Sequence, residues 1–318
     1  MREILTAGRY YRKKYGCNVY KTPISILGFT CPNIDGTVAK GGCTFCENES
    51  FSPNLTEKTP KKFFLNPKSV ENPFLENQLL QLESQFKQTK NRLAKKFGAK
   101  KFIVYFQSFS NTYAPIETLK ALYEKALSFD DVVGLSIGTR TDCLNGEILD
   151  FLVDLSKDKE IWIEYGIQSV YDETLDSINR GHDVENMTEW IKKTKDRGLK
   201  VCGHLIFGLP NETQEMMLDS VRYSMDLKID SLKFHSMYIT KNTMMANEFK
   251  QGKIDTISEE LYIDTLVKGI KMLPEDVMIQ RVCAGIDDSS LLSPAWCRDK
   301  HTQMKHIKEA LKNEGFLY

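Results

Sequence analysis

Three cysteines lie close together near the start of the chain, in the segment GFTCPNIDGTVAKGGCTFCENESF at residues 28–51. Cys43 and Cys46 form a C-x-x-C pair, and eleven residues separate Cys31 from Cys43. A structural zinc site needs four ligands, usually from two such pairs. Three thiols are one ligand short, so their spacing indicates a metal group that leaves one position open.

Three explanations of these thiols are open at this point. A zinc site would need Cys17 as a distant fourth ligand. Three incidental buried cysteines are disfavoured, because a loop rich in Gly, Asp, Asn and Thr does not bury its side chains. An iron–sulfur cluster usually takes four thiolates. A cluster held by three would leave one iron open, which is useful only if a substrate or cofactor binds there.

The chain around this loop alternates short apolar runs with helical patterns. Most runs are β-branched or aromatic and nearly continuous in apolarity, as in strands buried on both faces. Among the helical segments, APIETLKALYEKAL has Pro115 where a first turn tolerates it, and NMTEWIKKTKDRG ends at Gly198. NETQEMMLDSV opens with Asn211 and Gln214 as a capping box. The predicted strands are 24–29, 102–107, 132–137, 161–167, 201–207 and 232–238.

Repeated βα units predict a parallel sheet with right-handed crossovers. The expected fold is α/β, a partial (βα)6 TIM-like barrel with a C-terminal extension. We expect residues 1–240 to form the barrel, including the cysteine loop at 31–46, and residues 241–318 to pack on it. Residues 52–101 would form a loop and the first crossover helix. The cysteine loop follows the first strand, so it should lie at the carboxyl mouth, where such barrels place their chemistry.

The composition gives no sign of a membrane or of a general nucleic-acid-binding charge. The chain has 43 Lys+Arg and 43 Asp+Glu among its 318 residues. No apolar run approaches the length of a membrane span, and the basic start lacks the apolar core of a signal peptide. The uneven cysteine spacing does not suggest a disulfide framework. We expect a cytoplasmic protein whose thiols are free for metal binding or chemistry.

A three-cysteine loop after the first strand of a six-fold βα barrel resembles the radical S-adenosylmethionine (SAM) enzymes. Their common spacing is C-x3-C-x2-C, and the longer first gap here is similar to that of the elongator-type and YhcC/YtqA-type branches. CPNIDGTVAKGGCTFC closely resembles the latter branch. Later segments along nearly the whole chain resemble it too: YFQSFSNTYAP, GLSIGTRTDCL, EYGIQSVYDETLDSINRGHD, GLKVCGHLIFGLPNET and LLSPAWC.

The resemblance implies a [4Fe–4S] cluster on Cys31, Cys43 and Cys46, with SAM bound to the open iron through its amino and carboxylate groups. Reduction, by an electron donor such as flavodoxin or ferredoxin, would cleave SAM to methionine and a 5′-deoxyadenosyl radical. Such a radical removes a hydrogen atom from a suitably placed carbon, so the substrate is set by the pocket and not by the cluster.

The resemblance also implies residues that hold SAM. Phe45 matches the aromatic position beside the adenine. Gln168 and Arg180 match the residues that hold the methionine carboxylate and the ribose in coproporphyrinogen-oxidase-like relatives. An Arg suits that role, because its guanidinium meets a carboxylate with two hydrogen bonds. The alternative for Arg180 is a solvated charge at a helix end.

Other SAM positions have equally good alternatives. Ile206 matches an apolar residue that packs on the adenine, but plain strand core fits it as well. His204 replaces an acidic residue, and either bonds the ribose or is a satisfied core histidine. The segment that receives the SAM ammonium in the family is Gly-Gly-Glu-like, whereas residues 107–109 read Gln-Ser-Phe. Backbone carbonyls can still serve there.

The substrate is suggested by the YtqA-type branch, some members of which are associated with tRNA maturation at the C5 side chain of the wobble uridine. Basic segments at 9–14, 58–62 and 87–101, with aromatic residues interleaved, suit phosphate contact and base stacking. The alternative is that these are solvated faces. Two further function classes stay open: the same chemistry on a small metabolite, and a non-catalytic iron–sulfur or zinc binding protein.

A second set of metal-binding residue types lies near the end of the chain. Cys283, Cys297 and His301 fall short of a closed zinc site. They would bind a second metal, relay a radical or donate a hydrogen atom, or else be buried structural residues, which is the default for cysteine.

Overall fold

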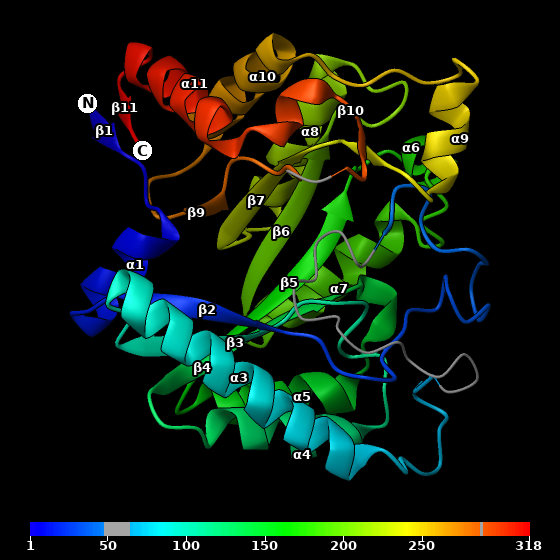
Figure 1. Cartoon of the computed structure of the whole chain (residues 1–318), viewed down its shortest axis with the longest axis vertical. Coiled ribbons are helices and arrows are strands. Elements are labelled where there is room, and N and C mark those ends of the chain that lie inside the picture. Colours follow the sequence, from blue (N-terminus) through cyan, green and yellow to red (C-terminus); the bar gives the residue numbers. More distant parts are fainter. Residues whose placement is uncertain (48–63, 287–288) are drawn as a thin grey trace.

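The computed structural model describes residues 1–47, 64–286 and 289–318. Its centre is a curved parallel sheet whose seven strands follow the order β2-β3-β4-β5-β6-β7-β9 (Figure 1). The edge strands β2 and β9 do not pair, so the barrel is open between them. The strands are β2 (Val19–Ile24), β3 (Lys101–Phe106), β4 (Val132–Thr139), β5 (Glu160–Gln168), β6 (Lys200–Phe207), β7 (Ser231–Ser236) and β9 (Met278–Arg281).

Five of the six predicted strands are confirmed, with bounds that differ by one or two residues. The first prediction, 24–29, is wrong, because β2 ends at Ile24. The apolar residues beyond it leave the sheet, and their backbone N–H groups bond to glutamine side chains of the helix α3 (Leu75–Phe97). Ser25 N donates to Gln85 Oε1 at 2.9 Å, and Leu27 N donates to Gln81 Oε1 at 2.8 Å.

The strand β9 adds a seventh member that the sequence analysis did not predict. It lies after residue 240, where the βα repeats were expected to stop, and it pairs with β7 in parallel. The C-terminal part of the chain therefore supplies sheet as well as the covering helices. The division into 1–240 and 241–318 stays a prediction.

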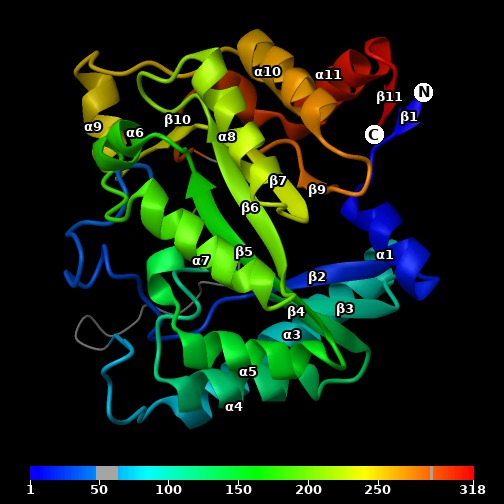
Figure 2. The same ribbon diagram turned by 180° about the vertical axis from the view of Figure 1, so that it is seen from behind.

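Helices cover the outer face of the sheet, as Figure 2 shows for α5, α7 and α8. The outward side chains of the strands are fully buried against them, for example Val104, Ile163 and Leu205. The described helices that follow β2 in the chain, apart from the short α9 (Met244–Lys250), are α3, α4 (Ile116–Leu127), α5 (Gly146–Ser156), α6 (Asp172–Ser177), α7 (Val184–Asp196), α8 (Gln214–Asp226), α10 (Glu259–Met272) and α11 (Lys300–Asn313).

The helix predictions are confirmed apart from one cap. Pro115 immediately precedes α4, and α7 ends just before the left-handed Gly198. The start of α8 differs, because Thr213 is its N-cap and accepts a hydrogen bond from the backbone N of Met216. Asn211 instead has a φ of 65° in the preceding turn, a conformation that Asn tolerates.

Short elements close the two ends of the barrel. The helix α1 (Ala7–Tyr15) lies beside the starts of β2 and β9, and Ile279 N donates to Leu5 O at 2.8 Å. The termini pair as β1 (Arg2–Glu3) and β11 (Phe316–Leu317).

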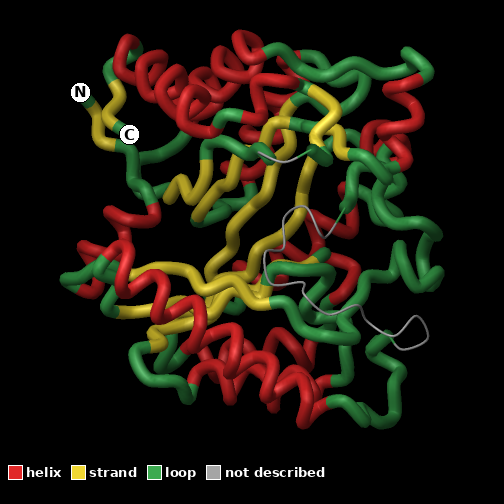
Figure 3. Tube along the Cα trace, viewed as in Figure 1, coloured by secondary structure: helices red, strands yellow, loops and turns green. Residues whose placement is uncertain are grey.

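In Figure 3 long loops, drawn green, gather on the right, where the chain after β2 runs and α9 (Met244–Lys250) lies. Remaining short elements are β8 (Ile239–Thr240), β10 (Leu291–Ser293), η1 (Thr141–Cys143) and η2 (Ala295–Arg298). No helix in the described ranges is long and apolar enough to cross a membrane.

Candidate active site

The cysteine loop follows β2 and is hydrogen-bonded to the turn after α6. Thr44 N donates to Ile178 O at 3.0 Å, and Asn179 Nδ2 donates to Gly42 O at 2.7 Å. Gly42 has a φ of 79°, which lets the loop reverse direction beside the turn. Two segments more than 130 residues apart in the chain are thereby joined at the carboxyl end of the sheet.

Asn33 makes a second connection between the cysteine loop and the turn after α6, and the sequence pattern did not predict it. Its Nδ2 donates to Asn179 O at 2.5 Å and to Arg180 O at 2.9 Å. A side chain at Gly181 would place a Cβ 2.7 Å from Asn33 Oδ1, and Gly181 also has a φ of 75°. Only glycine fits both demands, so the sequence Asn-Arg-Gly serves to dock the loop.

The three thiols lie together in this loop. Cys43 is buried, whereas Cys31 and Cys46 are partly buried. Burial, followed by the charges of Cys43 and Cys31, raises the pKa of Cys46; burial also raises the pKa of Cys31. The thiols of Cys31 and Cys46 are therefore protonated at neutral pH, and a metal that binds them must displace their protons.

Arg180 connects the thiols to the end of β5. Its Nη1 lies 3.6 Å from Cys43 Sγ, and its Nη2 donates to Gly166 O at 2.6 Å. A Cβ on Gly166 would stand 2.6 Å from Gln168 Nε2 and 2.8 Å from Arg180 Nη2. The absence of a side chain at Gly166 therefore lets Gln168 and Arg180 gather beside Cys43. Arg180 is buried, so it is not a solvated helix-end charge.

A second buried cation, Arg140, lies at the same site and was missed by the sequence analysis. Its Nε and Nη2 donate to the two oxygens of Asp142 at 2.8 and 2.6 Å. Burial would lower the pKa of Arg140, but the bonds and charge of Asp142 raise it overall, so the guanidinium stays charged. Its positive charge lowers the pKa of Cys31 and Cys46, although the larger effect of burial raises both. The signal for it lay in GTRTD, where a charged pair follows a buried strand directly.

Several polar atoms at this site have no partner among the described residues. They are Arg140 Nη1, Arg180 Nε, Asn33 Oδ1 and both ring nitrogens of His182. Burial, together with the charges of Arg180 and Arg140, lowers the pKa of His182 to about 3, so its ring is neutral. Unpartnered buried polar groups are costly. Their gathering here indicates a place for a polar ligand.

The remaining predicted SAM residues lie on nearby elements. Phe45 packs against the main core and is partly buried. Ile206 is partly buried on β6, on the same face as His204. In the segment 107–109, Gln107 N donates to Ile24 O at 3.2 Å, and Phe109 has a φ of 64°. The cofactor roles of these residues stay predictions.

His204 belongs to an ionic network inside the barrel. Its Nε2 lies 2.8 Å from Glu164, which is fully buried and also pairs with Lys21 and Lys233. Burial and then the charge of Lys233 lower the pKa of His204 to about 4. The environment of His204 is that of a satisfied core histidine, which was one of its two predicted alternatives.

Glu164, Cys202 and His204 have ligand atoms within 4.8 Å of one another. They do not offer a free metal site, because two ammonium groups already contact the carboxylate. A divalent cation would have to displace both. The group is better explained as an ion network that keeps a buried carboxylate charged.

Three cysteines outside the loop, Cys17, Cys283 and Cys297, are also metal-binding residue types. Cys17 precedes β2, whereas the cysteine loop follows it, and six strand residues span roughly 20 Å. Cys17 is therefore excluded as a fourth ligand. Cys297 is buried, with its sulfur 3.2 Å from Ser236 Oγ, and His301 is exposed at the start of α11. Within the described ranges, Cys283, Cys297 and His301 do not come close enough to share one ion.

Comparisons with known proteins agree with this geometry. A family model described as the Radical SAM superfamily matches residues 36–223, and one described as the Radical_SAM C-terminal domain matches residues 229–313. The chain is 33% identical over 313 residues to the uncharacterized protein YtqA of Bacillus subtilis, covering 98% of this chain and 90% of YtqA. It is 33% identical over 305 residues to protein YhcC of Escherichia coli, covering 95% and 90% of the two chains.

More distant similarities were also found. A tRNA uridine(34) acetyltransferase of Methanocaldococcus jannaschii is 29% identical over 153 residues, which cover 47% of this chain and 28% of that protein. The solved structure of the archaeal Elp3 of Methanocaldococcus infernus superposes with a TM-score of 0.58 at 19% identity. That match covers 93% of this chain and 64% of the archaeal one, and it shows a shared fold.

Proposed function

Because the chain belongs to the radical SAM superfamily, whose enzymes use a [4Fe–4S] cluster and SAM, we propose that Cys31, Cys43 and Cys46 hold the cluster. We further propose that this enzyme modifies the C5 side chain of a wobble uridine in tRNA. When bound and reduced, such a cluster would supply the electron for the reductive cleavage of SAM that is the chemistry of this superfamily.

The donor set fits an iron–sulfur cluster better than a single ion. Thiolates are soft ligands that suit zinc or iron–sulfur sites. A tetrahedral zinc with bonds of about 2.3 Å would hold its sulfurs roughly 3.8 Å apart. Within the described ranges, the sulfur atoms of Cys31, Cys43 and Cys46 are not all within 4.8 Å of one another. That wider spacing leaves room for a polynuclear group.

The observation that carries the cofactor assignment is the position of Arg180. One end of its guanidinium faces Cys43, while its Nε has no partner among the residues described. Arg140 Nη1 is likewise buried without a partner among the described residues. Two positively charged N–H donors are therefore available near the thiols. A carboxylate bound at an open iron would accept hydrogen bonds from such donors. Gln168, held beside Arg180, adds an amide that suits the ribose or carboxylate.

A basic surface beside the barrel supports a nucleic-acid substrate. We call it the α1/α3 basic surface, formed by Lys13, Lys95, Lys96, Lys100 and Lys101. Lys100 N donates to Asn18 O at 3.1 Å, and Lys101 lies 5.3 Å from the Tyr15 ring centre, so the ends of α1 and α3 are joined. None of these five lysines has an acidic partner in the described part of the chain. Such cations are available for phosphates.

Not every basic residue in the predicted segments is available. Lys14 pairs with the buried Glu160, and Lys87 pairs with Glu83 at 2.5 Å. The segment 58–62 lies outside the described residues. The support for RNA is therefore concentrated at the α1/α3 basic surface. The tRNA uridine(34) acetyltransferase among the relatives adds a second reason to choose tRNA.

Comparing tRNA nucleosides from cells with and without the gene tests this function. We expect a wobble-uridine nucleoside with a C5 side chain to disappear and its precursor to accumulate. An unchanged nucleoside profile, with no tRNA binding at low salt, would instead favour a small-metabolite substrate. Reduction of the cluster requires an electron donor, for which we propose a flavodoxin or ferredoxin.

A further inference from the structure

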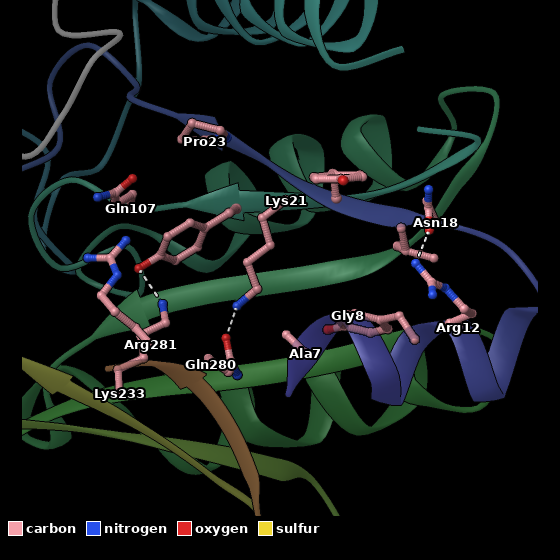
Figure 4. Close-up of a pocket in the computed structure, with 14 residues that line it drawn as sticks. Ala7, Gly8, Arg12, Asn18, Lys21, Pro23, Gln107, Lys233, Gln280 and Arg281 are labelled. Carbon is pink, nitrogen blue, oxygen red and sulfur yellow. Dashed lines mark hydrogen bonds between the residues drawn. The ribbon is translucent and has the colours of Figure 1, made fainter. Parts of the chain in front are cut away.

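A cavity of about 440 Å³ lies at the gap between the edge strands β2 and β9, beside α1. Figure 4 shows that Lys21, Lys233 and Arg281 approach it from β2, β7 and β9. Tyr105, Gln107 and Gln280 also line it. A cavity of this size is typical of small-ligand sites. None of these six residues belongs to the cysteine loop.

Positive charge exceeds negative charge at this cavity. Lys21 and Lys233 share a single carboxylate, that of Glu164. Arg281 is exposed, and its side chain has no hydrogen-bond or ion-pair partner within the described ranges. The exposed side of the cavity therefore carries an uncompensated guanidinium, with two ammonium groups behind it.

The neighbouring titratable groups do not cancel this charge. Burial, then the charge of Arg281, lowers the pKa of His235, and His204 is neutral as described above. Burial lowers the pKa of Lys233 to about 8, although Glu164 opposes the shift, so Lys233 keeps its proton at neutral pH. Burial and Glu164 raise the pKa of Tyr105, which therefore stays a neutral donor.

The side-chain amide of Gln280 offers a further hydrogen-bond donor to a ligand in the cavity. Gln280 Oε1 accepts a hydrogen bond from Lys21 at 2.5 Å, which fixes the orientation of the amide. Its Nε2 is buried and has no partner among the described residues. An unpartnered N–H beside three cations suits an oxyanion, which accepts several hydrogen bonds at once.

The cavity also reaches toward the cofactor site. Gln107 lines it and opens the segment 107–109, which is expected to hold the SAM ammonium. Three residues further on, Ser110 N donates to Thr30 O at 3.2 Å, and Thr30 directly precedes Cys31. Gln107, at the carboxyl end of β3, is therefore the lining residue that connects the cavity with the segment expected to hold SAM.

We propose that this cavity binds an oxyanion of the substrate, a carboxylate or a phosphate, through Arg281, Lys233 and the amide of Gln280. The assignment rests on the proposed function in one respect, namely that the substrate reacts inside the barrel. It adds that the reacting part of the substrate carries, or lies next to, a negative charge. The anion would neutralise Arg281 and position the reacting carbon beside the cofactor.

The melting temperature of the anaerobic, cluster-loaded enzyme tests the proposal without tRNA or turnover. The probes are inorganic phosphate and acetate, each compared with chloride at equal ionic strength, and acetamide is the uncharged counterpart of acetate. At about 20 mM probe and a dissociation constant of about 1 mM, the melting temperature should rise by about 2–4 °C. Arg281→Gln should abolish the rise, and Arg281→Lys should keep part of it.

The control is Lys95→Gln on the α1/α3 basic surface, which should retain the full rise. Stabilisation by phosphate alone would assign the site to a nucleotide phosphate, and stabilisation by acetate but not acetamide would assign it to a carboxylate on the reacting side chain. No rise with either anion, or an equal rise in Arg281→Gln, would overturn the proposal. Because no tRNA is present, either result leaves the tRNA assignment to be judged separately.

Discussion

The guanidinium of Arg180 lies 3.6 Å from the sulfur of Cys43, although 137 residues separate them in the chain. The same side chain is bonded to Gly166 O at the end of β5. Arg180 therefore connects the cysteine loop to the strand that carries Gln168. Because its Nε has no partner among the described residues, we expect the loss of Arg180 to weaken SAM binding.

Replacing Arg180 by Gln should weaken SAM binding while the protein still carries iron. A hydrogen bond to a charged group contributes about 1.5–3 kcal/mol, which corresponds to a loss of roughly ten- to a hundred-fold in affinity. Equilibrium binding of SAM to the reconstituted protein measures this. The matched control is Arg222→Gln, since Arg222 is a surface cation on α8 paired with Glu215 and Asp219. Equal affinities of parent and Arg180→Gln would show that the assigned role is wrong.

Each of Cys31→Ala, Cys43→Ala and Cys46→Ala should abolish or severely reduce cluster binding, because a three-thiolate site has no spare ligand. Iron and acid-labile sulfide per chain, measured after anaerobic reconstitution, give the result. Cys17→Ala is the control, since Cys17 lies at the opposite end of β2. Stoichiometric zinc without iron in the parent protein would contradict the cluster assignment.

The sequence predicted the positions of five strands correctly. It misplaced the first strand and did not predict β9, and both errors have physical causes. Apolar runs such as those around Ile163 and Val201 mark buried strands whichever way the chain is later arranged. The run after Ile24 looked the same, but glutamines of α3 satisfy its backbone in place of a neighbouring strand. The strand β9 has four residues, two of them polar, and its position depends on contacts with β7 and with the segment before α1.

The site was predictable in part for the same kind of reason. Cysteine spacing is local, so the loop and its three thiols could be identified. The network on Glu164 depends on strand register, which brings together residues more than 100 positions apart. One signal was present: Glu164 interrupts the apolar residues of β5 at a position that faces the barrel interior.

Glu164→Gln should destabilise the fold strongly. It would leave Lys21 and Lys233 inside the barrel without their shared carboxylate. Removing one partner of a buried ion pair costs about 3–5 kcal/mol. Denaturant unfolding of the parent and the variant measures the free energy of unfolding. Glu117→Gln serves as the control, because its pair with Lys120 is at the surface and contributes at most about 1 kcal/mol. An equally small effect for Glu164→Gln would show that the network does not stabilise the barrel.

The stability of the protein should depend on pH through Glu212. Burial raises the pKa of this carboxyl to about 7, against hydrogen bonds from Ser169 and Thr174 that lower it. Its folded-state pKa lies above that of the unfolded chain, so its contribution to stability is complete below about pH 4.5 and is lost as pH rises through about 7. Melting temperatures between pH 5 and about 8 should fall for this reason.

Glu212→Gln should remove this part of the decline and should be more stable than the parent at the upper end of the range. The exposed Glu260, changed to Gln, is the control and should leave the decline in place. Parallel curves for the parent and Glu212→Gln would mean that the carboxyl is already ionised in the folded protein at neutral pH.

Binding of tRNA should weaken steeply with salt, because each neutralised phosphate releases counterions. Replacing Lys95, Lys96, Lys100 and Lys101 by Ala should flatten the slope of log affinity against log salt, by up to about 0.9 for each lysine that contacts a phosphate. Filter binding over a salt series measures the slope. Changing Lys157, Lys193 and Lys268 to Ala is the control, since these lysines lie outside the α1/α3 basic surface and each pairs with an acidic residue three or four positions earlier in the chain. An unchanged slope in the first variant would remove the α1/α3 basic surface from the tRNA site.

The central claim is tested most directly by incubating the reduced holoenzyme with SAM and tRNA from cells that lack the gene. Mass spectrometry of the digested tRNA, with 5′-deoxyadenosine measured in the same samples, follows both products. We predict that a wobble-uridine nucleoside changes mass, that 5′-deoxyadenosine rises when the tRNA is added, and that Cys43→Ala shows neither change. An unaltered nucleoside profile, while the enzyme still cleaves SAM, would contradict the assignment to tRNA.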